Sequence, residues 1–88
     1  MVLRQNDRIA ARVIDGRAVL VTLGDNRLMV LNATGTFLWE RADGRSLDEV
    51  AGEMAEVFEV DVARARTECE AFANELLRRG ALLPADPG

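Results

Sequence analysis

Short runs of alternating apolar and polar residues fill the first third of the chain. Residues 8–14 and 17–23 flank Asp15-Gly16, a dipeptide that tolerates the positive φ angles of a two-residue hairpin turn. A second turn, GDN at residues 24–26, precedes the run RLMVL. This pattern predicts a three-stranded antiparallel β-meander whose third strand lies at the edge of the sheet.

Pairing Ile14 with Arg17 would divide the side chains of this meander between two faces that are both partly apolar. One face would hold Ile9, Ala11, Val13, Ala18 and Leu20, and the other would hold Val19, Val21, Leu23 and several arginines. The helices can cover only one of these faces. Part of the other face is therefore either shielded by the N-terminal arm or offered to a partner.

Helical periodicity replaces the alternation after residue 31. Asn32 and Thr34 are both plausible N-caps for a helix of about two turns that Gly44 would stop. SLDE at residues 46–49 is a capping box, and it is followed by apolar residues at helical spacing: Leu47, Val50, Ala51, Met54 and Val57 or Phe58.

A third, longer helix is expected to begin at Asp61 and to end at Gly80, with Pro84 as a breaker. Its apolar stripe would comprise Val62, Ala65, Cys69, Phe72, Ala73, Leu76 and Leu77. The expected order is βββααα, an α+β fold in a single domain over residues 1–84, with a tail at 85–88.

Composition agrees with one globular domain, since 49% of the 88 residues are apolar and 30% are charged. No apolar run approaches the roughly 20 residues of a membrane helix, and the N-terminus carries charges where a signal peptide would be apolar, so we expect a cytoplasmic protein. Residues 1–45 hold seven arginines and five acids, whereas residues 46–88 hold four arginines and ten acids. The second half is thus clearly acidic.

The residue types needed for most catalysis are missing. The chain has no histidine, tyrosine or lysine, so the usual pairs of nucleophile and base cannot be assembled, and the sequence predicts no enzyme, no cofactor and no metal site. Asp43, Asp48, Glu49 and Glu53 fall on turns and solvated helix faces, where caps and surface charge explain them. Cys69 and Trp39 are expected in the core rather than as a redox thiol or a ligand anchor.

An ordered set of short motifs resembles the PqqD-like family. The motifs are Leu31-Asn32, Thr34-Gly35, Leu38-Trp39-Glu40, Asp43-Gly44, Ser46-Leu47 and a final helix from Leu76 or Leu77 to Gly80-Leu82. The resemblance covers about residues 17 to 83. The chain has GDNRLMVL where the quinone-pathway pattern has a Pro-Glu before the third strand, which favours a standalone lasso-type or other leader-binding protein.

The resemblance implies a winged helix-turn-helix-like domain that recognises the leader of a ribosomally made precursor peptide and hands it to a modifying enzyme, such as a leader protease or radical SAM enzyme. Such domains occur in pyrroloquinoline quinone, mycofactocin and lasso-peptide pathways. The leader would add as a strand beside the third strand and against the last helix, a mode that an apolar edge strand independently favours. The expected contact residues are Arg27, Leu28, Met29 and Val30 on the strand and Arg64, Ala65, Glu68 and Phe72 on the helix.

Other functions compete with leader binding. A winged helix could place its third helix in a DNA groove, yet a pI of about 4.7 does not supply the basic face that phosphate neutralisation needs, and we expect no nucleic-acid or membrane partner. A structural subunit that stabilises a partner enzyme without touching peptide is a further alternative, and a homodimer is also left open.

Overall fold

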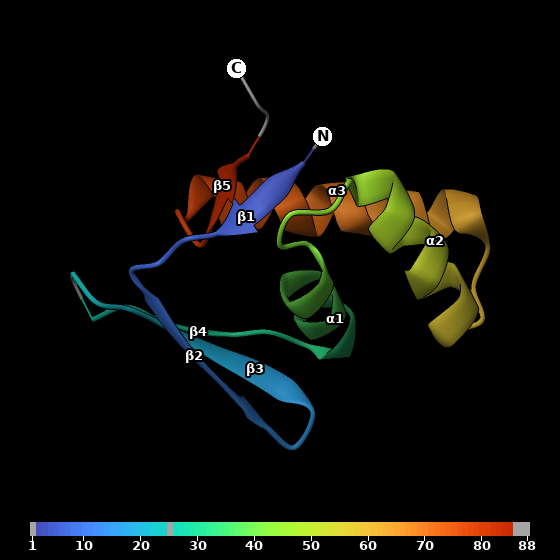
Figure 1. Cartoon of the computed structure of the whole chain (residues 1–88). Coiled ribbons are helices and arrows are strands. Elements are labelled where there is room, and N and C mark those ends of the chain that lie inside the picture. The colour runs from blue at the N-terminus through green and yellow to red at the C-terminus, as the bar shows by residue number, and fades with distance from the viewer. Residues whose placement is uncertain (1, 25, 86–88) are drawn as a thin grey trace.

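The computed structural model describes residues 2–24 and 26–85 of the chain. The expected order of three strands and three helices is confirmed, and one short strand is added at each end (Figure 1). The elements are β1 (Leu3–Gln5), β2 (Ile9–Ile14), β3 (Arg17–Thr22), β4 (Leu28–Val30), α1 (Ala33–Arg41), α2 (Leu47–Val57), α3 (Val62–Arg78) and β5 (Leu82–Pro84).

The meander forms as its turn chemistry predicts. Asp15 (φ 53°) and Gly16 (φ 78°) both adopt positive φ, and Ile14 pairs with Arg17 in the expected register. The strand order is β2-β3-β4, so β4 is an edge strand. Asn26 (φ 55°) takes the strained conformation in the second turn, whose middle residue, Asp25, lies outside the described residues.

One face of this sheet packs against the helices. Ala18 and Leu20 are fully buried there, and Ile9 and Met29 are packed against the core. Ala11 and Val13 share this face but are exposed, because the end of the β2–β3 hairpin extends beyond the helices (Figure 1). The other face of the sheet points away from the helices.

Helix α1 links the sheet to the rest of the core. Asn32 is its N-cap and accepts a hydrogen bond from the Gly35 amide at 2.8 Å, while the Thr34 hydroxyl donates to Asn32 rather than capping the helix itself. The Thr36 hydroxyl accepts from the Ala18 amide at 2.8 Å, which fixes α1 to β3. Three consecutive side chains of α1 are buried in the core: Phe37, Leu38 and Trp39.

Helices α2 and α3 pack on each other through the stripes that their spacing predicts. Ser46 caps α2 and accepts from the Glu49 amide at 3.2 Å. Asp61 occupies the N-cap position of α3 without making a side-chain cap. The buried residues of α3 are Ala65, Cys69, Ala73 and Leu76. The expectation that Val62 belongs to this buried stripe is wrong. Val62 is the first residue of α3 and is 52% exposed.

The two terminal strands were not expected. β1 and β5 pair antiparallel, with Leu3 opposite Pro84 and Gln5 opposite Leu82, so Pro84 ends a strand rather than following a helix. The N-terminal arm therefore covers β5 and not the open sheet face (Figure 1). Ala85, the first residue of the expected tail, donates to the Val2 carbonyl at 3.0 Å, and residues 86–88 lie outside the described residues.

Candidate functional site

The edge strand β4 leaves the backbone hydrogen-bonding groups of two of its three residues unused by the sheet. The Thr22 amide donates to the Arg27 carbonyl at 3.0 Å, and the Leu31 amide donates to the Ala18 carbonyl at 2.8 Å. Because bonded pairs alternate along an antiparallel ladder, Met29 bonds to Leu20 between them. The N–H and C=O groups of Leu28 and Val30 therefore point to the open edge.

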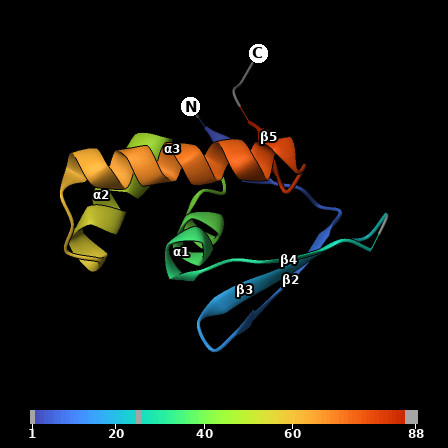
Figure 2. The same cartoon turned by 180° about the vertical axis from the view of Figure 1, so that it is seen from behind.

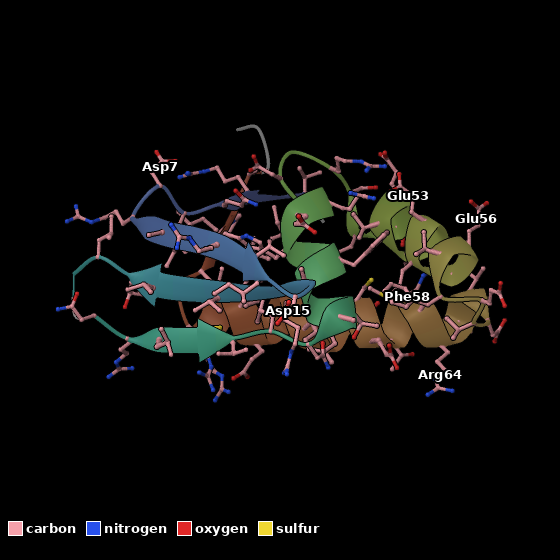
Figure 3. The ribbon with its side chains drawn as sticks, turned by 90° about the horizontal axis from the view of Figure 1, so that it is seen from below. Asp7, Asp15, Glu53, Glu56, Phe58 and Arg64 are labelled. Carbon is pink, nitrogen blue, oxygen red and sulfur yellow. The ribbon has the colours of Figure 1, made fainter. Side chains whose placement is uncertain are left out.

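A groove of about 470 Å³ runs beside this edge. Figure 2 shows α3 passing alongside the strand, and Figure 3 shows β4 as the outermost strand with α3 behind it. The strand side of the groove comprises Arg17, Leu28, Met29, Val30, Leu31 and Asn32. The helix side comprises Phe72, Glu75, Leu76 and Arg79, which follow one another at helical spacing. An extended segment laid in this groove would meet backbone on one side and side chains on the other.

A second hollow of about 200 Å³ adjoins the groove on the core side of the sheet. Its lining is mostly apolar and shares Leu28, Met29 and Arg79 with the groove; the other members are Ile9, Leu20, Thr22 and Arg27. Side chains that an added strand points toward the helices would enter this side.

The charges around the groove are arranged at its rim. Glu75 pairs with Arg78 and with Arg79, whose Nε lies 2.6 Å from Oε1 of Glu75. The hydrogen bond from Arg78, followed by that from Arg79, lowers the pKa of Glu75 below its ordinary value. On the strand side, Nε of Arg17 donates to the Leu31 carbonyl at 3.2 Å.

The structure brings together some of the residues expected from sequence. Leu28, Met29, Val30 and Phe72 line the groove, and Arg27 lines the adjoining hollow.

Three expected residues of α3 lie elsewhere. Ala65 is fully buried in the core and has no surface for a peptide. Arg64, which Figure 3 labels near the start of α3, forms an ion pair with the half-buried Glu68, 3.6 Å away, and neither residue lines the groove.

The groove is also lined by residues that the sequence had not indicated as contacts: Arg17, Leu31, Asn32, Glu75, Leu76 and Arg79. The signal for the last three was present, because they lie three, four and seven positions after Phe72 and thus on its side of the helix. The expected contacts extended from Phe72 toward the N-terminus of α3 instead.

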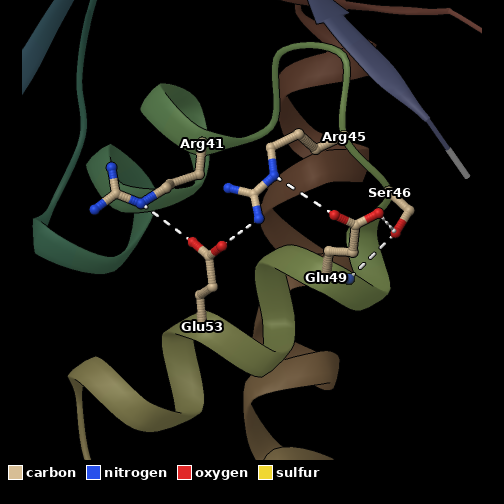
Figure 4. A network of polar contacts seen from close by, with 5 residues as sticks. All are labelled: Arg41, Arg45, Ser46, Glu49 and Glu53. Carbon is tan, nitrogen blue, oxygen red and sulfur yellow. Dashed lines mark hydrogen bonds and ion pairs between the residues drawn. The ribbon is translucent and has the colours of Figure 1, made fainter.

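The acidic surface of α2 has a structural explanation. Glu53 forms ion pairs with Arg41, at 3.3 Å, and with Arg45 (Figure 4). Glu49 forms an ion pair with Arg45 and accepts a hydrogen bond from the Ser46 hydroxyl. The hydrogen bond from Arg45 lowers the pKa of Glu53. This network ties the end of α1 to the first turns of α2. Asp43 likewise accepts from the Gln5 amide, at 2.8 Å.

Other chemistry finds no support in the part of the chain that is described. No cluster of three or more Cys, Asp or Glu residues there is arranged to hold a metal ion. Cys69 is buried, with Sγ 3.8 Å from Sδ of Met54, and burial raises the pKa of its thiol to about 11. None of the described helices combines the length and apolarity needed to cross a membrane.

Comparisons with known proteins agree with this architecture. A search of solved structures found "TbiB1 in Complex with the TbiA(beta) Leader Peptide", 20% identical with a TM-score of 0.85, covering 96% of this chain and 99% of that chain. It also found "Lasso peptide synthetase B1 complexed with the leader peptide", 26% identical with a TM-score of 0.84, covering 96% of this chain and 100% of that chain. A search of curated proteins found no match.

The family comparison bears on most of the chain. The model of coenzyme PQQ synthesis protein D (PqqD) matches residues 17–82, which include strands β3 and β4, the groove and all three helices. The resemblance noted in the motifs is thereby confirmed, and the chain belongs to the PqqD family.

Proposed function

We propose that this protein binds the leader region of a ribosomally synthesised precursor peptide and delivers it to a modifying enzyme, such as a leader protease or radical SAM enzyme, without itself catalysing a reaction. It would act in the cytoplasm, where such precursors are made. The observation that carries the proposal is the open edge of β4, which faces α3 across a groove.

Strand addition is the binding mode that this groove favours. Leu28 and Val30 offer outward backbone groups with which an extended peptide can pair. Main-chain pairing gives affinity for an extended segment, whereas Phe72 and the adjoining hollow would select apolar side chains. The two similar structures are of proteins bound to leader peptides, which supports the same class of ligand here.

The charges on α3 argue against binding of DNA. Each arginine of α3 and its C-cap already contacts a carboxylate: Arg64 with Glu68, Arg66 with Asp48, and both Arg78 and Arg79 with Glu75. A recognition helix needs such side chains for phosphates and base edges. In this protein they are paired within the domain.

Calorimetry with the leader peptide of the precursor tests the proposal directly. We expect a dissociation constant in the micromolar range or tighter, with weak dependence on salt because apolar and main-chain contacts dominate. Binding of duplex DNA that weakens steeply with salt, without binding of leader, would instead identify a DNA-binding protein. Binding of an enzyme with no affinity for any leader would identify a stabilising subunit.

A further inference from the structure

The face of the β2–β3–β4 sheet that points away from the helices is aliphatic and uncovered. Figure 3 views the molecule from this side, with the strands in front and α3 behind. Ile14, Leu28 and Val30 are 52%, 65% and 50% exposed, and Val19 and Val21 lie between them in the register. A shallow depression of about 370 Å³ crosses this face, lined by Ala10, Ala11, Arg12, Ile14, Val19 and Val21. Contiguous exposed apolar surface of this kind marks an interaction site.

The charges on this face have one sign. Strand alternation places Arg12 and Arg17 on the same side as Val19 and Val21, and none of the residues of β2, β3 and β4 on this side is acidic. Neither arginine forms an ion pair with another described residue. A complementary surface would therefore be aliphatic and carry carboxylates at its border.

This face is continuous with the peptide groove. Leu28 and Val30 expose their side chains on the sheet face and also line the groove. A strand added to β4 extends the sheet, and every second side chain of that strand then points to the same side as Leu28 and Val30. A protein seated on the face would thus touch the domain and the bound peptide together.

We propose that this outer face, enlarged by the bound leader strand, is the docking surface for the enzyme that modifies the precursor. The inference rests on the proposed function, because the leader supplies part of the surface. The enzyme meets it through an aliphatic patch bordered by carboxylates, which pair with Arg12 and Arg17. Docking on the composite surface makes the enzyme select the loaded protein over the empty one.

A second copy of this chain fits the face less well. Twofold stacking of two such faces would bring together Arg12 and Arg17 of both copies, without a carboxylate from the facing strands. The acidic surface of the chain lies on α2, around Glu49, Glu53 and Glu56. Contact between that surface and the sheet face of another copy would be head-to-tail and would not close into a dimer.

The test measures two quantities on the full chain: leader affinity by calorimetry, and the rate at which the enzyme that processes this precursor acts on it in the presence of the protein. Ile14→Asp and Arg12→Glu alter the face without touching the groove lining. Val57→Asp is the matched control, because Val57 is an equally exposed aliphatic residue, 60% exposed on α2. Thermal melts of each variant verify folding.

We expect both face variants to keep leader affinity within about twofold and to slow processing about tenfold, with Val57→Asp unchanged. The enzyme should also bind the loaded protein more tightly than the empty one. Unchanged processing in both face variants, or equal slowing by Val57→Asp, would overturn the inference. So would a dimer of the unaltered protein that Ile14→Asp dissociates, since the occupant would then be a second copy. Absence of leader binding to the unaltered protein is a separate readout and would refute the proposed function as well.

Discussion

Gly35 of α1 lies directly against the Phe72 ring of α3. A Cβ atom built on Gly35 would be 3.3 Å from Cε1 of Phe72 and 3.2 Å from Oδ1 of Asn32, the residue that caps the same helix. The absence of a side chain at Gly35 therefore lets the Phe72 ring pack against α1. The same ring lines the peptide groove. This contact explains why a glycine occupies the first turn of a helix.

Alanine at Gly35 should disturb the groove, whereas alanine at Gly52 should not. Gly52 is in α2 with no atom within 4 Å of a built Cβ, so Gly52→Ala should raise the free energy of unfolding by about 0.5–1 kcal/mol through helix propensity. Gly35→Ala gains the same propensity but must displace Phe72. We therefore expect Gly35→Ala to raise the free energy of unfolding, measured with urea, by less than Gly52→Ala does. We also expect Gly35→Ala to weaken leader binding. Equal stabilisation by both, with unchanged affinity, would contradict this role of Gly35.

Proline substitutions in β4 should distinguish the backbone amides that serve peptide binding from those that stabilise the sheet. The amide of Val30 points outward, so Val30→Pro removes a donor that serves only an added strand and should weaken leader binding about three- to tenfold with little change in stability. The amide of Met29 points to Leu20, so Met29→Pro should lower the free energy of unfolding by about 1–3 kcal/mol. Similar losses of stability in the two variants would remove the basis for a strand-addition site.

Charge reversal on α3 should identify the half of the helix that meets the leader. Glu75→Arg and Arg79→Glu alter side chains that line the groove, and we expect leader affinity to change by about 1–3 kcal/mol. Arg64→Glu and Glu68→Arg alter a solvent-accessible ion pair outside the groove, where an effect of a few tenths of a kcal/mol on leader affinity is expected. The four affinities are measured by calorimetry. A large loss at Arg64 or Glu68 would instead support the contact residues first expected from sequence.

The stability of the protein should fall between pH 9 and 11 because of Cys69. Burial raises the pKa of this thiol from 9.0 to about 11, so in this range the folded state holds a proton that the unfolded state has lost. Stability therefore decreases as pH rises, by on the order of 1–3 kcal/mol in total. With no lysine or tyrosine in the chain, no other side chain titrates here. Urea unfolding across this range checks the slope, which Cys69→Ala should abolish.

Local signals were sufficient to predict much of this fold. Asp15-Gly16 specifies the hairpin because its positive φ angles suit few other residues, and Asn32 specifies the start of α1 because its side chain satisfies a free amide. The pairing of β1 with β5 had no such signal. Each strand has three residues, and they meet across almost the whole length of the chain, so neither periodicity nor turn chemistry reports on their contact.

The two sides of the groove also differ in how far the sequence could predict them. The strand side follows from the meander, since a third strand after two turns must lie at an edge. The helix side depends on where α3 crosses that edge, which is decided by packing of Ala73 and Leu76 in the core rather than by any pattern along the helix. For this reason Phe72 was identified, while Glu75 and Arg79 were overlooked in favour of Arg64, Ala65 and Glu68.

The brevity of β4 has a consequence for colloidal behaviour. An open edge beside an aliphatic face is a template on which chains can stack into aggregates, and proteins counter this hazard by keeping such edges short. β4 ends at Val30, and the cap at Asn32 turns the chain into α1 almost at once. A guest strand thus gains only a few backbone bonds, which is too little to propagate a fibre but enough to assist a peptide whose side chains also fit. The same asparagine that begins a helix therefore limits how far this edge can polymerise.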